Sequence, residues 1–244
     1  EEGHAYRAVH AKGQALLKGV LTVAAGLPEE LAQGLFAAPA AFPVLVRISS
    51  PPAEQLPDAV STPRAIALKV MDVGGPRADP SFPHASQDFL MVNGPAFTSP
   101  NPAGFLRAAR ALASTTERMP RTKKLISATL RATEAALESV GGESSKLKGM
   151  GGEPRHHPLG ETYFTQVPFL YGSYVAKFSL APCSEALRQL KGVTLPNGDD
   201  AQRDAIRDFF SLASGAEWDL RVQLCRDIVR MPVEDASVRW DEEL

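Results

Sequence analysis

The stretch Val44-Leu45-Val46-Arg47-Ile48-Ser49 alternates with a period of two, which is typical of a half-buried β-strand. Its first, third and fifth side chains are apolar and share one face, whereas Arg47 and Ser49 lie on the other. An unpaired charge among apolar neighbours is costly, so Arg47 must reach solvent or meet an anion. The stretch therefore predicts a strand with one core face and one face that is suited to a ligand.

Three more stretches alternate in the same way, at 64–71, 173–180 and 218–224. In the first of them Ala65 and Ala67 make a small-residue face that could lie near a bulky planar ligand. Helical patterns occupy the middle of the chain and one later segment. A helix is predicted from Asn101 as N-cap with Pro102 in its first turn, a second over 126–140, and a third near 206–213. These patterns predict an α+β fold, a mixed antiparallel sheet or barrel with a helical insertion.

Length and charge limit the classes of protein to which the chain can belong. With 244 residues and 44% hydrophobic side chains it can bury one large core, and we expect a single domain over 1–244. A net charge of −2 gives no electrostatic reason to expect nucleic acid or an anionic membrane as partner. No stretch approaches the ~20 apolar residues that cross a bilayer. Cys183 and Cys225 are too few for a disulfide framework, so we expect reduced thiols.

The two ends of the chain bear on its location. The sequence begins Glu1-Glu2-Gly3 and stops at Leu244, directly after strand-like sequence. We therefore expect further residues at both ends in the full protein. A cytoplasmic location fits reduced thiols, although a signal peptide ahead of Glu1 stays open.

Three short strings carry groups for chemistry: Arg7-Ala8-Val9-His10, Arg47-Ile48-Ser49 and Asn93-Gly94-Pro95-Ala96-Phe97. Taken separately each is ordinary, because an Arg and a nearby His are most often a surface pair and Asn-Gly-Pro is usually a turn. Together they supply cations, an imidazole, a hydroxyl and an amide. Such a set can hold an anionic cofactor and move one proton.

In this order the strings resemble the core of the haem catalases. The stretch 7–13 (RAVHAKG) is similar to the segment that carries the distal His of that family. The stretches 47–49 (RIS) and 61–69 (STPRAIALK) resemble its Arg-Phe-Ser and Asp-Pro-Arg-Gly-Phe-Ala-x-Lys segments. The stretch 88–97 (DFLMVNGPAF) is similar to the segment with the distal Asn.

The resemblance covers most of the chain, more weakly in 172–178 and 208–240 and least in 101–150. Departures are also visible, because Gly94 and Thr98 stand where the family pattern has Thr and a second Phe, and Ile66 and Leu68 replace its more typical residues. The chain therefore resembles a small, divergent member of the catalase superfamily.

The resemblance implies a catalase-type antiparallel β-barrel with a helical insertion and outer helices, a haem b cofactor and a small-molecule peroxide as substrate. Arg7 and Arg47 would bind the haem propionates, because the planar guanidinium can grip a carboxylate with two hydrogen bonds. His10 would be the distal imidazole, Ser49 would orient it, and Asn93 would be the distal amide donor. Val9, Phe97 and Phe105 would wall the pocket.

Several alternatives stay open. The family's proximal iron ligand is a Tyr on a helix after the barrel, and no Tyr of this chain matches it, so we expect that helix beyond Leu244. His156-His157 lies in a loop and is expected to be solvated, not to bind metal. Hydrogen peroxide and organic hydroperoxides are both open as substrates, as is a homo-oligomeric assembly. The rival hypotheses are a non-enzymatic haem or apolar-ligand binder and a barrel without cofactor.

Overall fold

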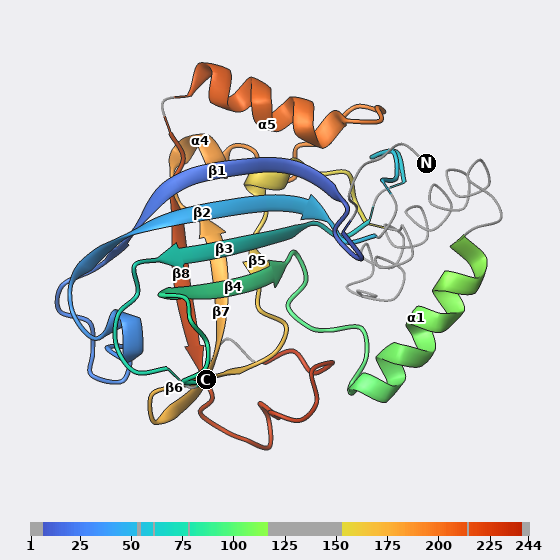
Figure 1. Cartoon of the computed structure of the whole chain (residues 1–244). Coiled ribbons are helices and arrows are strands. Elements are labelled where there is room, and N and C mark those ends of the chain that lie inside the picture. Colours follow the sequence, from blue (N-terminus) through green and yellow to red (C-terminus); the bar gives the residue numbers. More distant parts are fainter. Residues whose placement is uncertain are drawn as a thin grey trace.

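Four antiparallel strands form one layer of the molecule (Figure 1). The computed structural model describes residues 7–52, 55–60, 62–77, 79–116, 153–213 and 215–240. The strands are β1 (Lys12–Val23), β2 (Ala40–Ser50), β3 (Ala65–Met71) and β4 (Ser86–Val92), and each pairs with the next along the chain. The predicted strands at 44–49 and 64–71 are confirmed as parts of β2 and β3.

The register of this layer decides which side chains share a face. Ser49 is opposite Ala65, and Ala65 is opposite Val92. Two residues along the strands, a second row joins Arg47, Ala67 and Leu90. Because cross-strand partners project to the same side of a sheet, these six residues lie on one face, which we call the Ser49 face.

Four further strands complete the sheet. They are β5 (Tyr163–Phe164), β6 (Phe169–Tyr171), β7 (Tyr174–Pro182) and β8 (Trp218–Leu224), with β7 paired to each of the other three. The two parts join where Val92 of β4 pairs with Phe164 of β5. Strands β7 and β8 confirm that the stretches 173–180 and 218–224 form strands.

The prediction of a closed barrel is wrong for the part of the chain that the structure describes. The strand order is β1-β2-β3-β4-β5-β7-β6 with β8 beside β7, and no described ladder joins β1 to β8. Helix α5 (Ala201–Leu212) packs against β1 instead, and Arg203 Nη2 donates to the carbonyl of Gly13 at 3.1 Å. An edge strand covered by a helix needs no strand partner, so the sheet stays open there.

The described helices are few. Helix α1 (Pro102–Thr116) begins where the sequence predicts, since Asn101 Oδ1 accepts from the Gly104 amide at 3.0 Å. Helix α5 confirms the third predicted helix and begins earlier. The second predicted helix, 126–140, lies outside the described residues, so the helical insertion as a whole stays a prediction. The remaining elements are α4 (Glu185–Arg188), η1 (Gly34–Phe36) and η3 (Pro158–Gly160). None of the described helices is both long and apolar enough to cross a membrane.

An aromatic cluster fills the space behind the Ser49 face. Phe89 and Phe178 meet edge to face with ring centroids 4.9 Å apart, and Phe36, Phe169 and Tyr171 surround them. The residues that alternate with the Ser49 face on β2 to β4, such as Ile48, Ile66 and Met91, are buried in the same core. The sheet therefore has a packed inner face, and the Ser49 face is its outer face.

Candidate functional site

The backbone of His10 is held in an uncommon conformation. Its φ of 54° lies in the left-handed region, where non-glycine residues are rare. Two hydrogen bonds fix it there: the His10 amide donates to the Pro51 carbonyl at 2.8 Å, and the His10 carbonyl accepts from Arg47 Nη2 at 2.6 Å. Such strain persists only where surrounding contacts impose it, and it is concentrated at functional sites.

The His10 ring is oriented by Ser49. Ser49 Oγ lies 3.2 Å from Nδ1 of His10, and the serine itself is buried. Among the described residues nothing hydrogen-bonds to the other ring nitrogen, Nε2. A hydrogen bond at one ring nitrogen sets the orientation of the ring and leaves the second nitrogen to exchange a proton.

Two guanidinium groups stand beside this imidazole. Partial burial, and then the charges of Arg47 and Arg7, lower the pKa of His10 below its ordinary 6.5, so the ring is neutral at neutral pH. Burial and the Arg7 charge also lower the pKa of Arg47. Neither arginine forms an ion pair with a carboxylate of the described residues. A partly buried Arg47 and an exposed Arg7, both beside the imidazole, fit a ligand with acidic groups.

The pKa of His10 gives the first testable prediction. Replacing Arg47 with glutamine removes one of the two charges that disfavour the imidazolium, so we expect the pKa to rise towards 6.5 and, because burial still lowers it, to stay below. Because the pKa of His10 is lower in the folded protein than in the unfolded chain, the folded state resists protonation of this ring. The contribution of His10 to the free energy of unfolding is therefore complete above pH 6.5 and is lost as the pH falls towards the folded-state pKa.

The measurement is an NMR titration of the histidine ring protons, with the His10 signal assigned from a His10→Asn variant. The control is Arg221→Gln, which removes an exposed arginine of β8. A His10 titration curve that moves equally in both variants would show that Arg47 exerts no specific influence on the ring.

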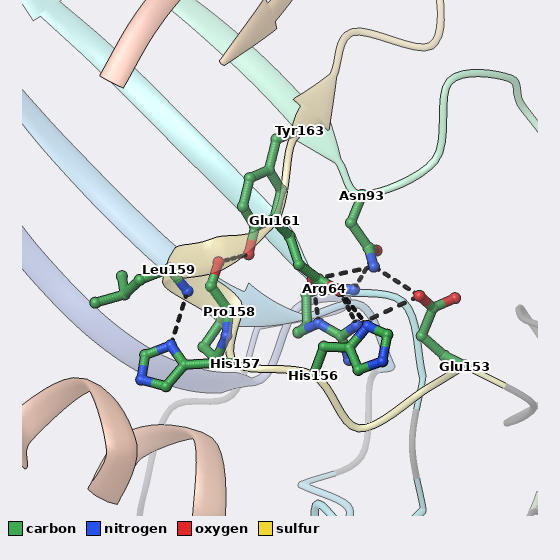
Figure 2. A network of polar contacts seen from close by, with 9 residues as sticks. All are labelled: Arg64, Asn93, Glu153, His156, His157, Pro158, Leu159, Glu161 and Tyr163. Carbon is green, nitrogen blue, oxygen red and sulfur yellow. Dashed lines mark hydrogen bonds and ion pairs between the residues drawn. The ribbon is translucent and has the colours of Figure 1, made fainter. Parts of the chain in front are cut away.

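Asn93 belongs to a second polar cluster, with Arg64, Glu153 and Glu161 (Figure 2). Its Oδ1 accepts from the Arg64 amide at 2.8 Å, and its Nδ2 donates to Glu153 at 2.7 Å and to Glu161 at 3.2 Å. This placement follows from the alternation of side chains along a strand. Val92 lies on the Ser49 face, so Asn93, the next residue, lies with Met91 on the interior side. The predicted role of Asn93 as an amide donor beside His10 does not agree with this placement.

Arg64 is the centre of that cluster. Its side chain is 1% exposed, its Nε and Nη2 both donate to the carboxylate of Glu161, and its Nη2 lies 3.3 Å from Glu153. Burial would lower the pKa of Arg64, but the two carboxylates outweigh burial and raise it, so the arginine stays charged. The cluster joins β3 to the segment before β5 and fixes the end of the sheet that carries Ser49.

The histidine pair at 156–157 departs from the sequence expectation. His157 is buried, and its Nδ1 accepts from the Leu159 amide at 3.2 Å, which caps the short helix η3. The expectation that it is solvated is therefore wrong. His156 is partly exposed, with Nδ1 3.9 Å from Glu161. Within the described ranges no group of three or more His, Cys, Asp or Glu side chains is placed to hold a metal ion, and Cys183 and Cys225 are free thiols.

The predicted pocket walls lie apart from the His10 cluster. The rings of Phe97 and Phe105 pack together with centroids 5.1 Å apart, and the Phe97 amide donates to the carbonyl of Ala236. Val9 is 60% exposed and Phe105 47%. No described contact joins these three side chains to His10. The structure thus brings together Arg7, His10, Arg47 and Ser49, but not the rest of the predicted set.

The described tyrosines do not offer an iron ligand near His10. Tyr163 is fully buried in the core and donates to the Pro158 carbonyl at 2.7 Å, and burial raises its pKa well above the ordinary value. Tyr171 donates to the Leu31 carbonyl at 2.5 Å and packs on Phe36. Tyr174 lies at the start of β7, and Tyr6 falls outside the described residues.

Sequence reasoning missed Val92. Its cross-strand pairing puts it in the row of Ser49 and Ala65, where Asn93 had been expected to supply an amide. The sequence contains the information needed to place both residues. Phe89 and Met91 are the core residues of this segment, and side chains alternate between the two faces of a strand, so Asn93 belongs to their face and Val92 to the opposite one. The outer face therefore presents a valine where the family resemblance led us to expect an asparagine.

Comparison with known proteins gives the fold. No protein-family model matches the chain, and no curated protein sequence matches it significantly. Among solved structures, it is similar to a bacterial catalase (18% identity, TM-score 0.63), a fungal catalase (19%, 0.63) and catalase A from Saccharomyces cerevisiae (18%, 0.63). Each match covers 99% of this chain and 46%, 48% and 50% of the respective catalase, so the chain spans about half of their length. The chain has a catalase-like fold built on a largely antiparallel sheet.

Proposed function

We propose that this chain forms the distal side of a haem-dependent, peroxide-processing enzyme. The observation that carries the proposal is the His10–Ser49 hydrogen bond at 3.2 Å beside Arg7 and Arg47, two arginines without a carboxylate partner among the described residues. A neutral, oriented imidazole next to a site for acidic groups suits a cofactor with carboxylates and a reaction that moves protons. The catalase-like fold supports the same proposal.

The residues present fit a haem on the Ser49 face. Arg7 and Arg47 would bind its propionates, and Ala65 and Ala67 are small enough for a flat ring to lie close to the strands. A Cβ at Gly13 would lie 3.5 Å from Arg47 Nη2, an ordinary van der Waals contact, so Gly13 borders the guanidinium. We further propose that Val9, Phe97 and Phe105 close over the pocket, and that the proximal ligand comes from outside the described residues.

His10 would carry the proton transfer. Its neutral Nε2 takes the proton from one oxygen of the peroxide and returns it to the other, which then leaves as water or an alcohol. Haem, when bound, supplies the iron that accepts the peroxide and the electrons that cleave its O–O bond. Overall, ROOH takes up two electrons and two protons to give ROH and water. A second molecule of hydrogen peroxide, which gives up two electrons and two protons to become dioxygen, or an organic reductant returns the electrons.

The proposal is tested by titrating the purified protein with haem and recording the Soret band, followed by peroxide turnover. We expect saturation at one haem per chain. Arg47→Gln should weaken haem binding about tenfold, because a charge-assisted pair to a propionate is lost. Arg221→Gln, on the exposed edge strand β8, serves as the control and should bind haem like the wild type. Failure of the wild type to take up haem would contradict the proposal.

A second candidate function is a haem or apolar-ligand binder without catalysis. The observation in its favour is the commitment of the Asn93 amide to Arg64, Glu153 and Glu161, which removes one expected hydrogen-bond donor from the distal side. Stoichiometric haem uptake with no peroxide consumption above that of free haem would select this candidate.

A further inference from the structure

We infer that the substrate of this site is an organic hydroperoxide with an apolar group, and that Val92 is the side chain that selects it. The inference rests on the proposed function and goes beyond it, since that function is open to hydrogen peroxide as well. It comes from the composition of the Ser49 face, which combines one hydrogen-bonding corner with an apolar wall.

The wall is defined by two rows of cross-strand partners. Ala65 and Val92 follow Ser49 in the first row, and Ala67 and Leu90 follow Arg47 in the second. Beyond the corner made by His10, Arg47 and Ser49, these rows carry alkyl groups as far as β4, and Phe164 of β5 follows Val92 in the first row. Leu16, the β1 partner of Arg47, extends the second row with another alkyl side chain, and both it and Leu90 are about 70% exposed.

Charged residues mark the limit of this wall. The next row along the strands joins Lys69 to Asp88, whose side chains form an exposed ion pair at 2.7 Å. This charged row, which also contains Leu45, separates the two rows beside His10 from the apolar residues Val20 and Pro43 further along the strands.

The Asn93 amide, which the family resemblance led us to expect beside His10, cannot readily turn towards this wall. Asn93 directly follows Val92, but all three of its polar contacts are with Arg64, Glu153 and Glu161. Rotation of its side chain would leave the buried guanidinium cluster with unpaired groups, which is strongly unfavourable. The apolar character of the wall is thus fixed by the cluster behind it.

An apolar wall distinguishes between peroxides by the group on the second oxygen. Hydrogen peroxide has no alkyl or aryl group, so it gains nothing from contact with the wall. In an organic hydroperoxide the second oxygen carries an alkyl or aryl group, which gains by leaving water for contact with Val92 and Leu90. The site therefore favours the organic substrate.

The test compares the wild type with Val92→Asn and the isosteric Val92→Thr, all loaded with haem. The first readout is the ratio of kcat/KM for cumene hydroperoxide to that for hydrogen peroxide. The second, which needs no turnover, is the dissociation constant of cumyl alcohol from calorimetry. We expect Val92→Asn to lower the ratio and weaken cumyl alcohol binding by about tenfold each, with smaller changes in Val92→Thr.

The matched control is Val20→Asn, which introduces the same group at a 67% exposed valine of β1, in the half of that strand beyond the Arg47 row. It should behave like the wild type in both readouts. Unchanged ratio and affinity in a Val92→Asn protein that still takes up haem would overturn the inference and leave the proposed function standing. Absence of haem uptake by the wild type would instead refute the proposed function.

Discussion

Replacement of Arg64 by methionine is expected to lower the free energy of unfolding by about 3–5 kcal/mol, the usual cost of breaking a buried ion pair by removing one partner. Arg64 is 1% exposed and binds the carboxylates of Glu153 and Glu161, which are themselves largely buried. Without the guanidinium, two carboxylates and the Asn93 amide would be left around an apolar side chain. The measurement is urea unfolding at pH 7, followed by circular dichroism.

The control removes an arginine that also forms an ion pair but lies on the surface. Arg188 pairs with Glu185 on α4 at 3.1 Å, but both side chains are more than half exposed, so Arg188→Met should cost at most about 1 kcal/mol. A second variant, Arg64→Met with Glu161→Gln, should recover part of the loss, because it removes one uncompensated charge. If Arg64→Met were no more costly than Arg188→Met, the cluster would not hold this end of the sheet.

The second large effect concerns His10. We expect His10→Asn to lower haem-dependent peroxide turnover about a hundredfold to ten-thousandfold, the usual range for loss of a general acid-base group, while haem uptake is retained. Asparagine is the better replacement here because it tolerates the left-handed backbone that His10 adopts at φ 54°, whereas alanine would add strain. Stopped-flow peroxide consumption by haem-saturated protein measures the effect.

Two companion variants make this prediction specific. Ser49→Ala removes the hydroxyl at 3.2 Å from Nδ1 and should give a smaller loss, since the imidazole remains but is less well oriented. His84→Ala, at an exposed loop position, should have no effect. Turnover that is equal in His10→Asn and His84→Ala would exclude His10 from the proton transfer.

Much of this architecture could be predicted from local patterns. The period of two in 44–49 identified both the core side of β2 and the outer side with Arg47 and Ser49, because burial of one sheet face imposes that alternation. The start of α1 was equally readable, since Asn101 and Pro102 form a local capping arrangement. Signals of this kind depend only on residues a few positions apart.

The errors have a different origin. Strand β1 was not predicted, because Leu16 and Val20 on its outer face are as apolar as Leu17 and Leu21 on its core face, so its sequence does not alternate between apolar and polar residues. The role of Asn93 was predicted from its motif and not from the face of the strand on which it lies. Its partners Glu153 and Glu161 are 60 and 68 residues away in sequence. Closure of the sheet depends on whether β1 meets a strand or a helix, which no local pattern encodes. These features are decided by long-range packing.

The central claim is that haem binds on the Ser49 face beside His10, and NMR of the histidine ring protons tests it most directly. Ferric haem is paramagnetic, so one equivalent should broaden the His10 signals beyond detection. The signals of His84, which precedes the opposite end of β4, should stay sharp, and diamagnetic zinc protoporphyrin should broaden neither. Unbroadened His10 signals in haem-saturated protein would contradict the account.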